Sequence, residues 1–145
     1  AEIGLRLAAE YPERVASLLM IGSGWTPAEG GDLYHASAAR ARSAESLLTP
    51  DPDLDALDAV AQGMPEIIGV APDRVAGLGM PLAGIVGDED PERPYLERMH
   101  EALPGFALDI LPGVAHAATW RDLSLPGRVA RFVDTAGQRR PELVH

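Results

Sequence analysis

Three short apolar runs divide the chain and predict its strands. They cover residues 15–21, 81–87 and 106–111, and each ends at a Gly or a Pro-Gly pair. A nearly continuous apolar run is typical of a strand that is buried on both faces of a parallel sheet. We therefore expect three buried strands, with the run at 15–21 as an interior strand.

The segments around these runs have apolar residues at helical spacing. This pattern predicts helices over 2–10, 92–102 and 121–135. Pro12 ends the first helix because the residue before a proline avoids helical geometry, and we expect Gly137 to end the last. No side chain that favours a helix N-cap precedes the first helix. The alternation of strands and helices predicts the α/β class, with about three parallel strands and flanking helices.

The long middle segment lacks strand character. Residues from about 25 to 79 are rich in Ala, Asp, Pro and Gly, and they predict short helices at 34–48, 54–62 and 72–77. We interpret the segment as a cap-like helical insertion within a single domain that covers 1–145.

Composition excludes several classes of function. Twelve basic residues, all Arg, face 22 Asp and Glu, and the net charge of -10 repels phosphate, so we expect no nucleic-acid partner. The longest apolar run, at 16–21, is far short of the roughly 20 residues of a membrane helix, so we expect a soluble protein in the cytoplasm and no membrane partner. The chain has no Cys and only four scattered His, and we assign neither a metal site nor a cofactor.

Polar residues follow each strand where an open α/β sheet binds its ligands. An acidic loop, 88–90, follows the second run, and His116 follows the third. An Asp beside a His suits a carboxylate that fixes the tautomer of an imidazole general base. Two alternatives stay open: the acids cap the helix that starts near Glu92, and His116 is a loop histidine without a catalytic role.

Four blocks of sequence resemble the α/β-hydrolase family. Residues 5–15, Leu-Arg-Leu-Ala-Ala-Glu-Tyr-Pro-Glu-Arg-Val, resemble the helix after the nucleophile elbow. Residues 81–91 are similar to the family's strand and acid loop, Pro-x-x-x-x-x-Gly-x-x-Asp, and residues 103–116 to the next strand with its Pro-Gly-x-x-His loop. Residues 125–133 resemble the last helix. The resemblance implies a partial α/β-hydrolase fold that starts just after the elbow.

This resemblance also implies the roles of two residues and a reaction. Asp90, not Asp88, takes the place of the triad acid, and His116 takes the place of the general base. The implied substrate is a carboxylic ester or a related acyl compound, and dehalogenase, epoxide hydrolase and perhydrolase variants stay open. Fold alone does not choose among them.

The nucleophile of the family has no counterpart in this sequence. No Gly-x-Ser-x-Gly occurs in it, so we expect the nucleophile and the oxyanion hole in a segment outside this chain. Ser23 is a candidate substitute nucleophile, although Gly-Ser-Gly is usually only a turn. Trp25 is a candidate substrate-binding residue, with simple packing as the alternative.

A second hypothesis makes the chain a non-catalytic truncated fragment or an assembly module. A strand at 15–21 without its neighbour would expose unpaired backbone groups. We therefore expect a complementing N-terminal half, or a homodimer that forms through this edge.

Overall fold

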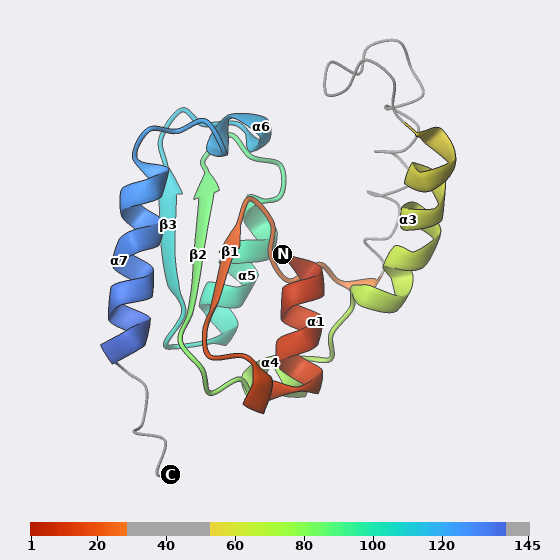
Figure 1. Ribbon diagram of the computed structural model, residues 1–145, viewed down its shortest axis with the longest axis horizontal. Helices are drawn as coiled ribbons and strands as arrows, with labels where there is room; N and C mark the ends of the chain where they lie inside the picture. Colours follow the sequence, from red (N-terminus) through yellow and green to blue (C-terminus); the bar gives the residue numbers. More distant parts are fainter. Residues whose placement is uncertain (29–52, 139–145) are drawn as a thin grey trace.

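A three-stranded parallel sheet forms the centre of the protein (Figure 1). The computed structural model describes residues 1–28 and 53–138. The strands are β1 (Leu18–Ile21), β2 (Leu82–Gly87) and β3 (Ala107–Leu111), in the order β1-β2-β3. The helical elements are α1 (Glu2–Glu10), η1 (Pro12–Arg14), α3 (Leu54–Ile67), α4 (Pro72–Ala76), α5 (Arg93–Ala102), α6 (His116–Thr119) and α7 (Leu125–Gln138). The α/β class and the three parallel strands are confirmed.

The interior strand is β2, and the prediction of an interior strand at 15–21 is wrong for the described residues. All six residues of β2 are buried, whereas only Met20 is buried in β1. Within the described part of the chain, β1 pairs with β2 alone. The apolar run reflects side chains that are covered on both faces of the sheet, and that pattern does not show whether the backbone edge is also paired.

Helices cover both faces of the sheet. On one face, side chains of α1 and α5 form a cluster with Met20 and Val86. On the other face, Leu125 and Val129 of α7 pack with Ile85. Figure 1 shows the sheet between α7 and the layer that holds α1 and α5. Because β2 and β3 are parallel, the loops that follow them leave the sheet at the same end.

Helix boundaries differ from the predictions mainly near the C-terminus. The predicted helix at 2–10 is α1, and its N-terminus makes no side-chain capping bond. The final helix starts at 125, not 121, because Ser124 donates to the Asp122 carboxylate in a turn before it. It also continues through Gly137, which does not end it.

In the middle segment, helices α3 and α4 correspond to the predictions at 54–62 and 72–77, and α3 continues to residue 67. The predicted helix at 34–48 lies outside the described residues. No helix in the ranges 1–28 and 53–138 is long and apolar enough to cross a membrane.

Candidate active site

The acid loop after β2 brings Asp90 into a buried position. Asp90 is 4% exposed, and its carboxylate accepts the N–H of Glu92 at 2.9 Å. This contact lies in the turn before α5, whose N-cap residue Glu92 makes no side-chain capping bond. That contact uses only part of the acceptor capacity of a carboxylate, which has about four lone-pair sites.

The imidazole of His116 lies directly against this carboxylate. His116 Nδ1 is 3.0 Å from Asp90 Oδ2 and 3.1 Å from Oδ1. An ionised carboxylate only accepts hydrogen bonds, so Nδ1 carries the proton and Nε2 is an acceptor in the neutral ring. The side chain of His116 is 48% exposed, while that of Asp90 is 0% exposed. In this acid–base pair, the carboxylate of Asp90 is therefore buried and the imidazole of His116 is open to solvent.

Asp88 has a different partner. Its carboxylate accepts the N–H groups of Gly113 at 2.7 Å and Val114 at 3.3 Å, both in the loop before His116. Gly87 stands where the two loops meet, because a Cβ there would lie 1.7 Å from the carbonyl oxygen of Val114. The structure thus places Asp90 against the imidazole and Asp88 under the His116 loop. The catalytic roles of Asp90 and His116 stay predictions.

Gly22 closes the site from the side of β1. Its φ is +69°, a conformation that L side chains rarely adopt. A Cβ at this position would lie 3.5 Å from Cε1 of His116 and 3.7 Å from Oδ2 of Asp90. The glycine lets the chain turn sharply after β1 and pass close to the acid–base pair.

Ser23 points to a carboxylate and not to the imidazole. Its hydroxyl donates to Glu2 Oε1 at 2.7 Å, and the hydroxyl of Thr26 donates to the same oxygen at 2.7 Å. Glu2 is only 7% exposed. The role of Ser23 as a substitute nucleophile stays a prediction, and in this arrangement its hydroxyl proton is directed to Glu2.

Glu92 completes the charged surroundings of the pair. Burial is the largest influence, and it raises the pKa of the Glu92 carboxyl group above the ordinary value of 4.5. The negative charges of Glu2 and Asp90 raise this pKa further. The hydrogen bond with Ser23 and the charge of His116 lower it, but by less. Sequence reasoning missed both Glu2 and Glu92. A signal existed for Glu2, which shares one helical stripe with the buried Leu5 and Ala9.

Trp25 lies in the core of the protein. It is 4% exposed, its indole N–H donates to the carbonyl oxygen of Val70 at 2.8 Å, and the guanidinium of Arg98 lies 3.7 Å from its ring centroid. These contacts tie the loop after β1 to α5 and to the chain before α4. Its proposed contact with a substrate stays a prediction.

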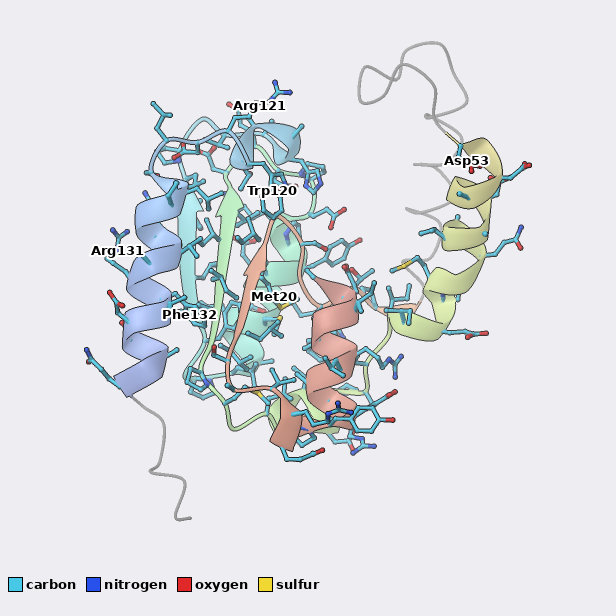
Figure 2. The ribbon with its side chains drawn as sticks, viewed as in Figure 1. Met20, Asp53, Trp120, Arg121, Arg131 and Phe132 are labelled. Carbon is cyan, nitrogen blue, oxygen red and sulfur yellow. The ribbon has the colours of Figure 1, made fainter. Side chains whose placement is uncertain are left out.

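A second tryptophan lies near the pair at the surface. Trp120 directly follows α6, four residues after His116, and is 62% exposed. Figure 2 shows it beside α6, at the end of the sheet where the strands finish. Leu123 is 98% exposed nearby in the sequence. The sequence interpretation did not single out this apolar surface beside the histidine.

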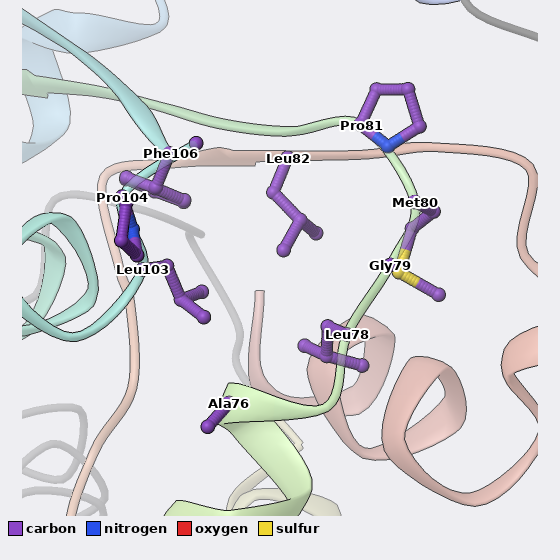
Figure 3. Close-up of a pocket in the computed structure, with 10 residues that line it drawn as sticks. Ala76, Leu78, Gly79, Met80, Pro81, Leu82, Leu103, Pro104 and Phe106 are labelled. Atoms are coloured by element: carbon purple, nitrogen blue, oxygen red, sulfur yellow. The ribbon is translucent and has the colours of Figure 1, made fainter.

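One cavity among the described residues lies away from Asp90 and His116. A space of about 440 Å³ is lined by residues between α4 and β2 and by the turn before β3, including Leu78, Met80 and Phe106 (Figure 3). These residues stand at the amino ends of the strands, whereas Asp90 and His116 follow the carboxyl ends. The cavity is therefore not part of the candidate site. In the two described ranges, no cluster of three or more His, Asp or Glu side chains is arranged to hold a metal ion.

Several solved structures share the backbone fold of this chain. A carboxylesterase of the thaumarchaeon Nitrososphaera gargenis matches 96% of the chain with a TM-score of 0.77 at 15% identity. NosK from Streptomyces actuosus matches 94% with a TM-score of 0.71 at 22% identity. A meta-cleavage product hydrolase from Pseudomonas fluorescens matches 94% with a TM-score of 0.60 at 18% identity.

The chain spans only 63%, 65% and 61% of the lengths of these three proteins. No protein-family model matches the sequence, and no curated protein is significantly similar to it.

Proposed function

Since the chain forms part of an α/β-hydrolase fold, we propose that it supplies the acid and the base of a hydrolase active site for a carboxylic ester or a related acyl compound. The contact between Asp90 and His116 carries this proposal. A buried carboxylate that holds Nδ1 of a half-exposed imidazole leaves Nε2 available to a substrate.

In the proposed reaction His116 acts first as a base and then as an acid. Its Nε2 takes the proton of a hydroxyl nucleophile while the hydroxyl oxygen attacks the ester carbonyl carbon. Asp90 stabilises the imidazolium, which then gives the proton to the leaving alcohol as the ester C–O bond breaks. Water, deprotonated by His116, next attacks the acyl-enzyme; the acid is released and the nucleophile recovers its proton.

The nucleophile and the oxyanion hole are proposed to come from a complementing segment outside this sequence. Two features of the described residues support such a partner. The outer edge of β1 is unpaired among the described strands. Ile3 and Leu7 lie four residues apart on α1 and are 68% and 45% exposed, and Tyr11, directly after the helix, is 46% exposed. A strand beside β1 and a helix against these side chains would cover both features.

A complementation assay tests this proposal. The chain is mixed with an N-terminal half that carries a Gly-x-Ser-x-Gly elbow, and hydrolysis of a short-chain nitrophenyl ester is followed. We expect activity only in the mixture, and a loss of roughly 10³-fold or more with His116→Ala. Hydrolysis by the chain alone that disappears with Ser23→Ala would instead identify Ser23 as the nucleophile. No activity in any mixture would count against the proposal.

The outer edge of β1, which has no partner strand within residues 1–28 and 53–138, also supports a second candidate function. In this alternative the chain is a non-catalytic module that forms a homodimer through β1. Native mass spectrometry would then give twice the mass of 15.4 kDa, and no complemented form would hydrolyse esters. A monomer at micromolar concentration would contradict the homodimer.

A further inference from the structure

The sheet has a second outer strand, β3, on the side opposite β1 (Figure 1). Within the described part of the chain, β3 pairs with β2 alone. The carbonyl oxygen of Leu111 accepts the N–H of Asp88, so the backbone of Leu111 points to the side of β2. Backbone groups of alternate residues in a strand point to opposite sides, and those of Leu108 and Ile110 therefore face the free edge. Such an edge is a template for pairing with another strand.

A groove of about 380 Å³ lies beside this free edge, between β3 and α5. Leu108 and Ile110 form the apolar part of its lining, and Ile110 is 38% exposed. Glu97, His100 and Glu101 of α5 form the polar part. We call these five residues and the space between them the β3 groove. The same two residues of β3 thus offer both backbone groups and apolar side chains to a partner.

The polar side of the β3 groove offers acceptors of hydrogen bonds. Glu101 is exposed and makes no ion pair with another described residue, whereas Glu97 Oε1 lies 2.6 Å from Nη2 of Arg93. His100 Nδ1 is 2.9 Å from the carbonyl oxygen of Phe106. A carbonyl only accepts, so Nδ1 donates and Nε2 is an acceptor in the neutral ring. A partner that carries donors and positive charge suits this side.

We propose that the β3 groove binds an extended basic segment of a partner protein, which adds a strand to β3. The aliphatic stems of Lys or Arg cover apolar surface while their charged heads stay in water. In the β3 groove the stems lie over Leu108 and Ile110, and the heads reach the two carboxylates of α5. The net charge of -10 adds long-range attraction.

This surface is separate from the candidate active site. Asp90 and His116 take no part in it, so the inference does not depend on the proposed function.

A second copy of this chain fits the β3 groove less well. Pairing of β3 with β3 in a closed dimer is isologous, so the same patch stands on both sides of the contact. Glu97 and Glu101 of both copies would then lie on the same face of the joined sheet, where like charges repel. A basic segment gives the same strand pairing with attraction in place of repulsion.

The first test measures binding of a fluorescein-labelled peptide made of four Thr-Lys repeats, whose Lys side chains share one face of an extended strand. Fluorescence anisotropy with this chain gives the affinity at low ionic strength. The double variant Glu97→Gln/Glu101→Gln should weaken binding roughly tenfold. Glu10→Gln/Glu13→Gln is the matched control, because Glu10 also pairs with an arginine four residues away and Glu13 is exposed. Equal losses in the two variants would show attraction by net charge alone and overturn the proposal.

Backbone pairing is tested on the wild-type chain, so this arm does not depend on the folding of a variant. Two further peptides carry N-methyl groups on every Lys nitrogen or on every Thr nitrogen. Both keep their charge, but one of them loses the donors that face β3. That peptide should bind roughly tenfold or more weakly than the parent. Equal affinity of all three peptides would overturn strand addition.

Amide hydrogen exchange locates the bound peptide. The N–H groups of Leu108 and Ile110 should become protected, while that of Asp109, which faces β2, should change little. Protection of Leu19 and Ile21 instead would place the peptide on the free edge of β1 and overturn the proposal. A dimer of this chain that protects the β3 edge without peptide would also overturn it, in favour of a second copy.

Discussion

The carboxylate of Asp88 accepts the N–H of Gly113 at 2.7 Å, and this bond joins the loop after β2 to the loop that carries His116. Two residues further on, Asp90 contacts the imidazole itself. One short acidic loop therefore holds both the loop before the histidine and the side chain of the histidine. The two carboxylates have separable effects, because only Asp90 contacts the titratable ring.

The first prediction separates these two acids. Asp90→Asn should lower kcat of the complemented enzyme by roughly 10⁴-fold, because an amide N–H can turn toward Nδ1 and favour the wrong tautomer. Asp88→Asn keeps an oxygen that accepts from Gly113 and should lower kcat less than about tenfold. Ester hydrolysis measures both, with thermal unfolding as the control for folding. Equal losses in the two variants would contradict the assignment of Asp90.

The second prediction concerns the turn beside the acid–base pair. Gly22→Ala should lower the free energy of unfolding by about 1–2 kcal/mol, since alanine must adopt a φ of +69° against His116. Gly105→Ala is the matched control, because no atom lies within 4 Å of its Cβ position and its φ is not positive. Urea unfolding should give a change within about 0.5 kcal/mol for the control. A neutral Gly22→Ala would show that the turn relaxes freely.

The strands and the loops after β2 and β3 could be predicted from the sequence, because both depend on the local pattern of apolar residues and glycines. Apolar runs that end at glycine gave β2 and β3 within one residue of their starts. β1 starts three residues later than its run, because the N–H of Val15 donates to the carbonyl oxygen of Pro12 in a turn before it. A run of apolar residues does not show where the turn before it ends. It also does not show whether a strand such as β1 has a second neighbour in the sheet.

The contact between Ser23 and Glu2 could not be predicted in the same way. Glu2 and Ser23 are 21 positions apart, and they meet only because α1 packs beside the loop after β1. The apolar stripe on α1 gives a reason to suspect Glu2, but no local signal pairs it with a serine or places Glu92 nearby. Trp25 illustrates the same limit, since its partner Val70 is 45 residues away.

The third prediction tests the role of Trp25. Trp25→Phe should lower the free energy of unfolding by about 1–3 kcal/mol, because the buried carbonyl of Val70 loses its donor. Trp120→Phe is the matched control at a tryptophan that is 62% exposed, and it should change stability by less than about 0.5 kcal/mol. Urea unfolding measures both variants. A stable Trp25→Phe with a raised KM would favour substrate contact over packing.

The fourth prediction is a pH dependence of stability that arises from Glu92. Its pKa is raised in the folded protein from 4.5, so the folded state binds the proton more tightly than the unfolded state. The contribution of this group is therefore fully favourable below about 4.5, and it is lost as pH rises from there through the raised folded pKa. Glu92→Gln removes this contribution, so the variant should gain stability relative to wild type as pH rises through that window.

Urea unfolding of both proteins at a series of pH values isolates the effect, because other groups titrate alike in the two chains. Glu89→Gln serves as the control at an exposed carboxylate of the same loop. A difference between Glu92→Gln and wild type that stays constant with pH would show that the folded environment does not favour the protonated acid. A difference of opposite slope would show that folding favours the ionised carboxylate, and Ser23 would then be its donor.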